Sequence, residues 1–196
     1  VFDRSGKQKN TIASISNPYG VFIKGDVMYV ADRDNHRIQK VTTGGQFLQK
    51  FGQHGSGQVQ LSGPRGVIVD ANDRVIVSDY ANNRIQIFNK DGGWLLTIDG
   101  KGSDEHAFQH PIGLALDPQG NIHVAASGSN TIKVFKPEGR YIRSYGCMQK
   151  PRGVAVDKHG YCFVSGNDLE IFDPQGHKIT EVCCGRMHSS TTYFSD

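Results

Sequence analysis

The sequence predicts an all-β protein, and more specifically a β-propeller built from four-stranded antiparallel blades. A Pro-x-Gly tripeptide begins an alternating apolar run four times, at Pro18, Pro64, Pro111 and Pro151. The same order of short apolar segments follows each tripeptide, at spacings of 46, 47 and 40 residues, which identifies an internal repeat. Glycine accounts for 24 of the 196 residues, and this excess indicates many turns between short strands.

Each repeat contains four short segments that are rich in Val, Ile, Phe and Tyr and are bounded by Gly, Asp, Asn or Pro, as β-strands are. In chain order of the repeats, the first segments read GVFIK, GVIVD, GLALD and GVAVD, and the second read VMYVAD, VIVSD, IHVAA and CFVSG. The third read RIQKV, RIQIF, TIKVF and LEIF, and the fourth read QFLQKFG, WLLTID, RYIRSYG and HKITEV. These segments are too short for helices, so each repeat predicts one antiparallel sheet.

The strands are apolar on both faces, because Val67 and Val69 point to one side of the sheet and Ile68 to the other. Such a sheet packs between two neighbours, and sheets arranged about one axis form a propeller; a solenoid usually has fewer strands in each repeat. We expect blades at 17–63, 64–110, 111–150 and 151–185, preceded at 1–16 by the end of an earlier blade and followed by a tail at 186–196. A surplus strand at Thr11–Ile15 favours four complete blades of a larger ring.

Composition excludes a disordered chain and a transmembrane one, since hydrophobic residues make up 37% and no apolar run approaches the length of a membrane span. The formal net charge of +3 is too small to predict a nucleic acid or a membrane surface as the partner. Cys147, Cys162, Cys183 and Cys184 form no CxxC pattern and predict reduced thiols in a cytoplasmic protein. No signal-peptide pattern is present and the first residue is Val1, so we expect the sequence to begin inside a longer chain.

Two segments, DRDNHRIQ at 32–39 and DYANNRIQ at 79–86, resemble NHL repeats when read together with the Pro-x-Gly tripeptides. The resemblance covers residues 1–185 and is closest to the C-terminal propellers of tripartite-motif (TRIM-NHL) proteins. It implies a six-bladed ring that binds proteins or RNA, with any ubiquitin ligase activity in a RING domain, of which this sequence contains no cysteine-histidine pattern.

The later repeats depart from this signature, with Ala126 in place of the aspartate and Thr131 in place of the arginine. The signature is therefore expected to stabilise the fold rather than to contact a ligand. An aspartate that ends the second strand can accept hydrogen bonds from the turn and pair with the arginine that begins the third.

Alternating strand directions bring two sets of loops to one face, which is the expected binding face. Its basic residues are Arg33, Arg37, Arg65, Arg84, Lys101, Lys150 and Arg152, and its acidic residues are Asp32, Asp34, Asp79, Asp99, Asp104, Glu105 and Asp168. Equal numbers argue against RNA, which requires a clustered positive excess. The candidate partner-binding residues on this face are Tyr19, Arg33, His36, Arg65, Tyr80, Asn83 and Arg152. Arginine with tyrosine is typical of a protein-binding hot spot.

The residues predict no catalytic or metal site. The first strand of each repeat carries no ionisable group at its alternating positions, and Asp70, Asp117 and Asp157 recur beside turns, where aspartate stabilises the turn. His106 and His110 lie in a loop with no third ligand nearby, so we expect no metal and no other cofactor.

We therefore expect a non-catalytic module that binds a protein partner, as the recognition part of a TRIM-NHL-like ubiquitin ligase or scaffold. Binding of single-stranded RNA is the alternative, and a propeller lyase or lactonase is the third possibility. Neither a membrane nor a small-molecule substrate is expected.

Overall fold

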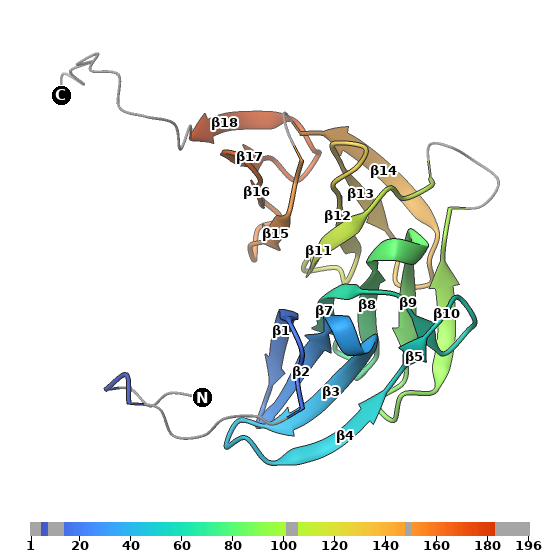
Figure 1. The fold of residues 1–196 in the computed structure, drawn as a ribbon. Coiled ribbons are helices and arrows are strands. Elements are labelled where there is room, and N and C mark those ends of the chain that lie inside the picture. The colour runs from blue at the N-terminus through green and yellow to red at the C-terminus, as the bar shows by residue number, and fades with distance from the viewer. Residues whose placement is uncertain (1–4, 8–13, 101–105, 148–149, 183–196) are drawn as a thin grey trace.

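The structure, a computed structural model, describes residues 5–7, 14–100, 106–147 and 150–182. It contains four four-stranded antiparallel sheets, each with its strands in chain order, which confirms the predicted all-β propeller architecture. The sheets stand side by side as blades in an arc, with β1, β7, β11 and β15 on the inside and β4, β10, β14 and β18 on the outside (Figure 1).

The blades follow one another along the chain. The first contains β1 (Pro18–Lys24), β2 (Val27–Asp32), β3 (Arg37–Thr42) and β4 (Phe47–Phe51), and the second contains β7 (Pro64–Val69), β8 (Val75–Asp79), β9 (Arg84–Phe88) and β10 (Trp94–Ile98). The third contains β11 (Pro111–Leu116), β12 (Ile122–Ala126), β13 (Thr131–Phe135) and β14 (Tyr141–Gly146), and the fourth contains β15 (Gly153–Val156), β16 (Cys162–Ser165), β17 (Leu169–Phe172) and β18 (Lys178–Val182). Between the first two blades lies a short parallel pair, β5 (Gln53–His54) and β6 (Gln60–Leu61).

Two short 3-10 turns, η1 (Arg33–Asn35) and η2 (Tyr80–Asn82), connect the second and third strands of the first two blades. Within the described residues, no helix is long and apolar enough to cross a membrane. Of the surplus strand expected at Thr11–Ile15, residues 11–13 lie outside the described residues, and the two described residues are not in a strand. The expected tail at 186–196 also lies outside them.

Each pair of adjacent blades shares a hydrophobic core, as the two-sided apolar strands predict. Ala31 and Ile38 of the first blade pack with Val77 of the second, and all three are fully buried. The opposite face of the second blade packs on the third through a cluster that includes Ile76 and Phe135. A third cluster, which includes Ile132 of the third blade and Phe172 of the fourth, fills the interface between these two blades.

The glycine of each Pro-x-Gly tripeptide allows the innermost strands to approach one another closely. A Cβ atom on Gly20 would lie 2.3 Å from the Arg65 carbonyl oxygen, and one on Gly66 would lie 2.3 Å from the Ile112 carbonyl oxygen. A side chain at either position would therefore displace the backbone of the next blade.

The blades are also joined by a repeated hydrogen bond, which we call the interblade latch. One residue just before the third strand has a positive φ, and its side chain accepts a hydrogen bond from the backbone N–H that precedes the next blade's proline. The three latches join His36 Nδ1 to Gly63 N (3.0 Å), Asn83 Oδ1 to His110 N (2.8 Å) and Asn130 Oδ1 to Lys150 N (2.8 Å). This contact fixes the start of each innermost strand relative to the preceding blade.

Candidate functional site

The aspartate and arginine of the repeat signature form buried ion pairs. Arg37 Nε donates to Asp32 Oδ2 at 2.7 Å, and the Asp32 side chain is fully buried. In the second blade Arg84 Nε donates to Asp79 Oδ2 at 2.7 Å, and this carboxylate is also fully buried. The predicted pairing of these residues is confirmed.

These pairs also hold the segment that leads into the blade. Asp79 Oδ1 accepts a hydrogen bond from the backbone N–H of Ser62 at 2.6 Å, and Arg84 Nη2 donates to the Gln60 carbonyl at 2.9 Å. Burial raises the pKa of Asp79, although the bonds from Asn82, Ser62 and Arg84 oppose this shift. Because Ser62, Asn82 and Arg84 all donate to it, the Asp79 carboxylate stabilises the fold and is not available to a ligand.

The aspartates that recur after the innermost strands also act in turns, as predicted. One carboxylate oxygen of Asp70 accepts the backbone N–H groups of Asn72 and Arg74, both at 2.9 Å. Asp117 and Asp157 accept equivalent pairs of backbone N–H groups in the third and fourth blades. These carboxylates therefore have structural roles.

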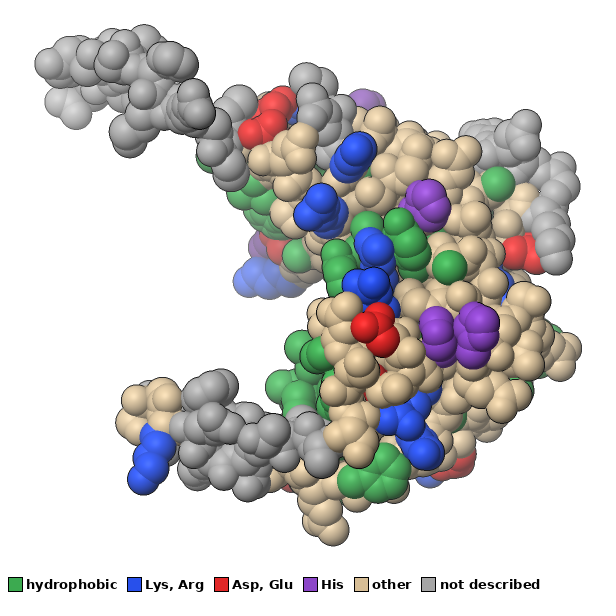
Figure 2. Space-filling view, in the orientation of Figure 1, with side chains coloured by type: hydrophobic (Ala, Val, Ile, Leu, Met, Phe, Trp, Pro, Cys, Tyr) green, Lys and Arg blue, Asp and Glu red, His purple; other side chains and the backbone are tan. Residues whose placement is uncertain are grey.

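A pocket at one end of the innermost strands, here called the mouth pocket, collects basic and aromatic side chains. Its volume is about 480 Å³, and it is lined by Tyr19, Arg65, Tyr80, His110, Ile112, Ser127, Gly128, Lys150 and Arg152. On this face of the molecule, Lys and Arg side chains gather near the middle of the arc (Figure 2). The pocket is therefore positively charged.

Arg65 lies at the centre of the mouth pocket between two aromatic rings. Its guanidinium carbon is 3.4 Å from the centroid of the Tyr80 ring and 5.0 Å from that of Tyr19. The Tyr80 ring in turn stacks on His110, with ring centroids 4.8 Å apart and planes 20° apart. Because these rings restrict its side chain, the guanidinium is oriented before any ligand arrives.

The positive charge of the mouth pocket is not neutralised within the described part of the chain. No described carboxylate forms an ion pair with Arg65, Lys150 or Arg152. The Nε atom of Arg65 is buried and has no hydrogen-bond partner among the described residues. The Arg65 guanidinium therefore has hydrogen-bonding capacity that no described residue uses.

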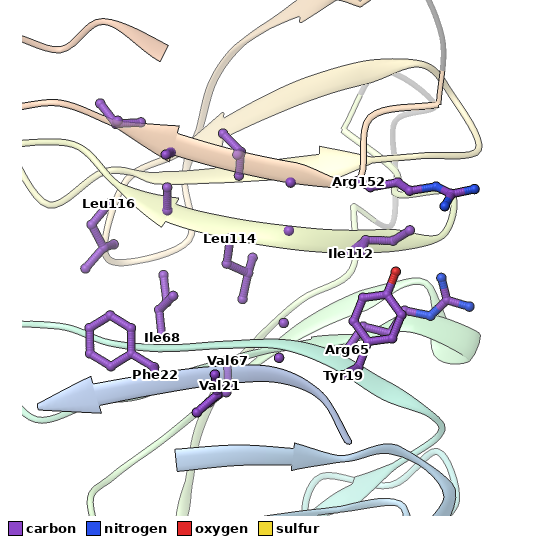
Figure 3. Close-up of a pocket in the computed structure, with 18 residues that line it drawn as sticks. Tyr19, Val21, Phe22, Arg65, Val67, Ile68, Ile112, Leu114, Leu116 and Arg152 are labelled. Carbon is purple, nitrogen blue, oxygen red and sulfur yellow. The ribbon is translucent and has the colours of Figure 1, made fainter. Parts of the chain in front are cut away.

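A second cavity continues from the mouth pocket along the innermost strands, and its lining is here called the channel wall. The cavity has a volume of about 530 Å³ and shares Tyr19, Arg65, Ile112 and Arg152 with the mouth pocket. Figure 3 shows the two arginines at one end of the strands and apolar side chains along the rest. The other lining residues are Gly20, Val21, Phe22, Gly66, Val67, Ile68, Gly113, Leu114, Ala115, Leu116, Gly153, Val154, Ala155 and Val156.

The structure brings together four of the seven candidate residues, since Tyr19, Arg65, Tyr80 and Arg152 all line the mouth pocket. The other three have different surroundings. Arg33 pairs with Asp34 at 3.3 Å, while His36 and Asn83 accept the interblade latches. Partner binding by these seven residues remains a prediction.

His110 and Lys150 also line the mouth pocket, although neither was among the seven candidates and Lys150 was expected only as a basic residue of the binding face. Both residues precede the proline of a Pro-x-Gly tripeptide and have a positive φ, of 52° and 35° respectively. Their position in the repeat was the signal that could have identified them. His110 and Lys150 directly precede the proline of the tripeptide, and Tyr19, Arg65 and Arg152 directly follow it in their own repeats.

The histidines and cysteines have other roles in the fold. His106 stacks on Tyr141 with ring centroids 4.2 Å apart, whereas His110 stacks on Tyr80. The described residues contain no group of three or more His, Cys, Asp or Glu side chains that could hold a metal ion. Burial raises the pKa of Cys162 to about 11, so this thiol is neutral and unreactive near pH 7.

Comparison with known proteins supports the repeat and the fold. Residues 61–88 match the NHL repeat family, so the chain contains an NHL repeat. Among curated protein sequences, none matches the chain. The NHL match includes the signature segment of the second blade, in which Asp79 pairs with Arg84.

Solved structures with the same fold include proteins of different kinds. Virginiamycin B lyase from Staphylococcus aureus has a TM-score of 0.67 and 16% identity, over 85% of this chain and 55% of the lyase. A structure of the nidogen/laminin complex has a TM-score of 0.73 and 17% identity, over 91% of this chain and 68% of that one. A gluconolactonase from Xanthomonas campestris has a TM-score of 0.67 and 17% identity, over 85% of this chain and 61% of the enzyme. The chain thus spans little more than half the length of the lyase.

These similarities correct the functional prediction. The expectation of a non-catalytic recognition module of a TRIM-NHL-like ligase or scaffold is contradicted, because structures of this fold include a lyase and a lactonase. The error came from treating the absence of an acid-base pair on four inner strands as evidence against an enzyme. At 16–17% identity the comparisons establish the propeller fold, and within that fold both enzymes and a protein complex occur.

Proposed function

We propose that the mouth pocket binds the anionic group of a small-molecule ligand, with Arg65 as the central contact. The observation that carries this proposal is the state of Arg65: it is held between two tyrosine rings, and no described carboxylate pairs with it. Arginine presents a planar fork of N–H donors that matches a carboxylate or a phosphate.

The surroundings of Arg65 strengthen its interaction with an anion. Lys150 and Arg152 line the same pocket, so three cationic side chains lie around one volume. The aromatic rings exclude water from the guanidinium faces, and a lower local dielectric increases the attraction between opposite charges. The nearby aspartates do not compete, since the carboxylates of Asp32 and Asp79 are buried in their own ion pairs.

The channel wall shares its ionisable side chains with the mouth pocket. Among the described side chains of the channel wall, these are Tyr19, Arg65 and Arg152. We propose that these groups bind and orient a negatively charged ligand.

Titration of the chain with sodium acetate and with inorganic phosphate, at constant ionic strength, tests the proposal. Amide chemical shifts from NMR detect weak binding and show where it occurs. We expect shifts at Tyr80 and His110, and an affinity about tenfold or more weaker in Arg65→Gln, because a hydrogen bond to a charged group is worth about 1.5–3 kcal/mol.

Arg33→Gln is the matched control, since Arg33 is an arginine that does not line the mouth pocket and its loss changes the net charge equally. This control is expected to bind both anions as the unmodified chain does. Equal weakening by both substitutions would show nonspecific attraction to the face and would overturn the proposal. If neither acetate nor phosphate bound to the chain, the proposal would be overturned as well.

A further inference from the structure

The channel wall differs sharply in chemistry from the mouth pocket with which it is continuous. Beyond Tyr19, Arg65 and Arg152, the wall carries only glycine and apolar side chains. Val21 is 58% exposed, and the nearby Leu114 and Ile68 are 8% and 7% exposed. An apolar surface therefore begins at the point where the positive charge ends (Figure 3).

We infer that the ligand is an amphiphilic monocarboxylate, whose carboxylate binds Arg65 and Arg152 while its apolar chain lies along the channel wall. This inference rests on the proposed function, because it takes the mouth pocket as the anion site. It adds the chemical class of the remainder of the ligand.

The lining favours this class over more polar ligands. The side chains of the wall offer no hydrogen-bonding group beyond the mouth, so polar contacts there are limited to backbone groups at the inner edges of the innermost strands. An alkyl chain loses no hydrogen bonds and gains free energy from the burial of apolar surface. The cavity volume of about 530 Å³ lies within the range of small-molecule sites.

The positions of the mouth pocket and the channel wall determine how the ligand is oriented. Arg65 lies at the start of β7 in the second blade and Arg152 directly precedes β15 in the fourth, with β11 of the third blade between them. Val67 and Val154 follow two residues after each arginine and line the channel wall. In Figure 3 both arginines project from the same end of the strands, away from the apolar side chains. A carboxylate held between the arginines therefore directs its chain along the strands.

The test is a series of straight-chain carboxylates, namely acetate, butyrate, hexanoate and octanoate, titrated into the chain at constant ionic strength. We expect the affinity to rise with chain length by up to about fourfold for each added methylene, the limit for complete burial. Arg65→Gln is expected to weaken every member of the series by a similar factor. Val21→Gln is expected to reduce the gain from chain length while leaving acetate binding unchanged.

Ile179→Gln is the matched control for Val21→Gln, because Ile179 is 54% exposed on β18 and does not line the channel wall. It should leave the whole series unchanged. Acetate binding that depends on Arg65 but does not strengthen with chain length would overturn this inference and leave the proposed function standing. A chain-length effect that Val21→Gln and Ile179→Gln alter equally would also overturn the inference. Absence of binding by all four carboxylates would overturn both.

Discussion

The latch between the first and second blades differs from the other two because its acceptor is a histidine. His36 Nδ1 accepts the Gly63 N–H, whereas Asn83 and Asn130 supply amide oxygens at the equivalent positions. An imidazole nitrogen accepts a hydrogen bond only when it is unprotonated. We therefore predict that His36→Asn preserves the latch, that His36→Ala removes it, and that the strength of the latch itself depends on pH only when its acceptor is histidine.

The magnitude follows from the hydrogen bond and the backbone. A single intramolecular hydrogen bond contributes about 0.5–1.5 kcal/mol, and leaving the partner N–H unsatisfied adds to the loss. His36 has a φ of 53°, a conformation that histidine and asparagine adopt more readily than alanine. His36→Ala is therefore expected to lower the free energy of unfolding by about 1–2 kcal/mol at pH 7.5, and His36→Asn by less than about 0.5 kcal/mol.

The direction of the pH dependence follows from the surroundings of His36. Burial and the neighbouring ring of His54, whose centroid is 4.3 Å away, lower the pKa of His36, while the carboxylates of Asp34 and Asp79 oppose this shift. The unfolded chain then binds a proton more readily than the folded one. The latch's contribution is fully present above the unfolded pKa of about 6.5 and is lost as the pH falls.

Urea unfolding followed by far-ultraviolet circular dichroism, at pH 7.5 and pH 5.0, measures these effects. His123 also has a pKa lowered by burial, so some loss of stability at pH 5.0 remains in His36→Asn. The informative quantity is the difference in the free energy of unfolding between the original chain and His36→Asn, and this difference should grow as the pH falls. A difference independent of pH, or a His36→Ala chain as stable as the original, would refute the reasoning.

Two further predictions concern the packing of the blades. Gly66→Ala is expected to lower the free energy of unfolding by about 1–3 kcal/mol, because the added Cβ would overlap a carbonyl of the next blade, whereas Gly146→Ala, with open space around the Cβ, should change it by less than about 0.5 kcal/mol. Equal melting temperatures for the two variants would contradict this. Arg84→Ala leaves the carboxylate of Asp79 buried and unpaired and should cost about 3–5 kcal/mol, against less than about 1 kcal/mol for Arg33→Ala at an exposed pair. Urea unfolding that shows similar losses for both arginines would contradict the assignment.

The blades could be predicted from the sequence because each is specified by local signals. Pro-x-Gly marks the start of the innermost strand and alternating apolar residues mark each strand in all four repeats, so an error in one repeat would have conflicted with the other three. Aspartate marks the turn after the innermost strand in the last three repeats, at Asp70, Asp117 and Asp157. The glycine in particular has a physical reason, since a Cβ on Gly20 would lie 2.3 Å from a carbonyl oxygen of the adjacent blade.

The charge of the binding face could not be predicted by counting. Asp32 and Asp79 contribute negative charge to the count, yet each is fully buried and paired with its own arginine. Asp34 is likewise paired with Arg33. Removal of these three ion pairs still leaves four basic and four acidic residues in the count. The mouth pocket is positive because Arg65, Lys150 and Arg152 line it and no acidic side chain does, among the described residues. A count along the sequence does not show which charged groups lie together.

The mouth pocket depends on contacts between blades, which is why the sequence indicates it only in part. Arg65 begins the second blade, and its aromatic neighbours Tyr19 and Tyr80 come from the first blade and from the loop after β8. The latch from Asn83 fixes His110, and this ring supports Tyr80 from the other side. The orientation of Arg65 therefore arises from the same interblade contacts that stabilise the fold, so substitutions at the latch are expected to alter anion binding as well as stability.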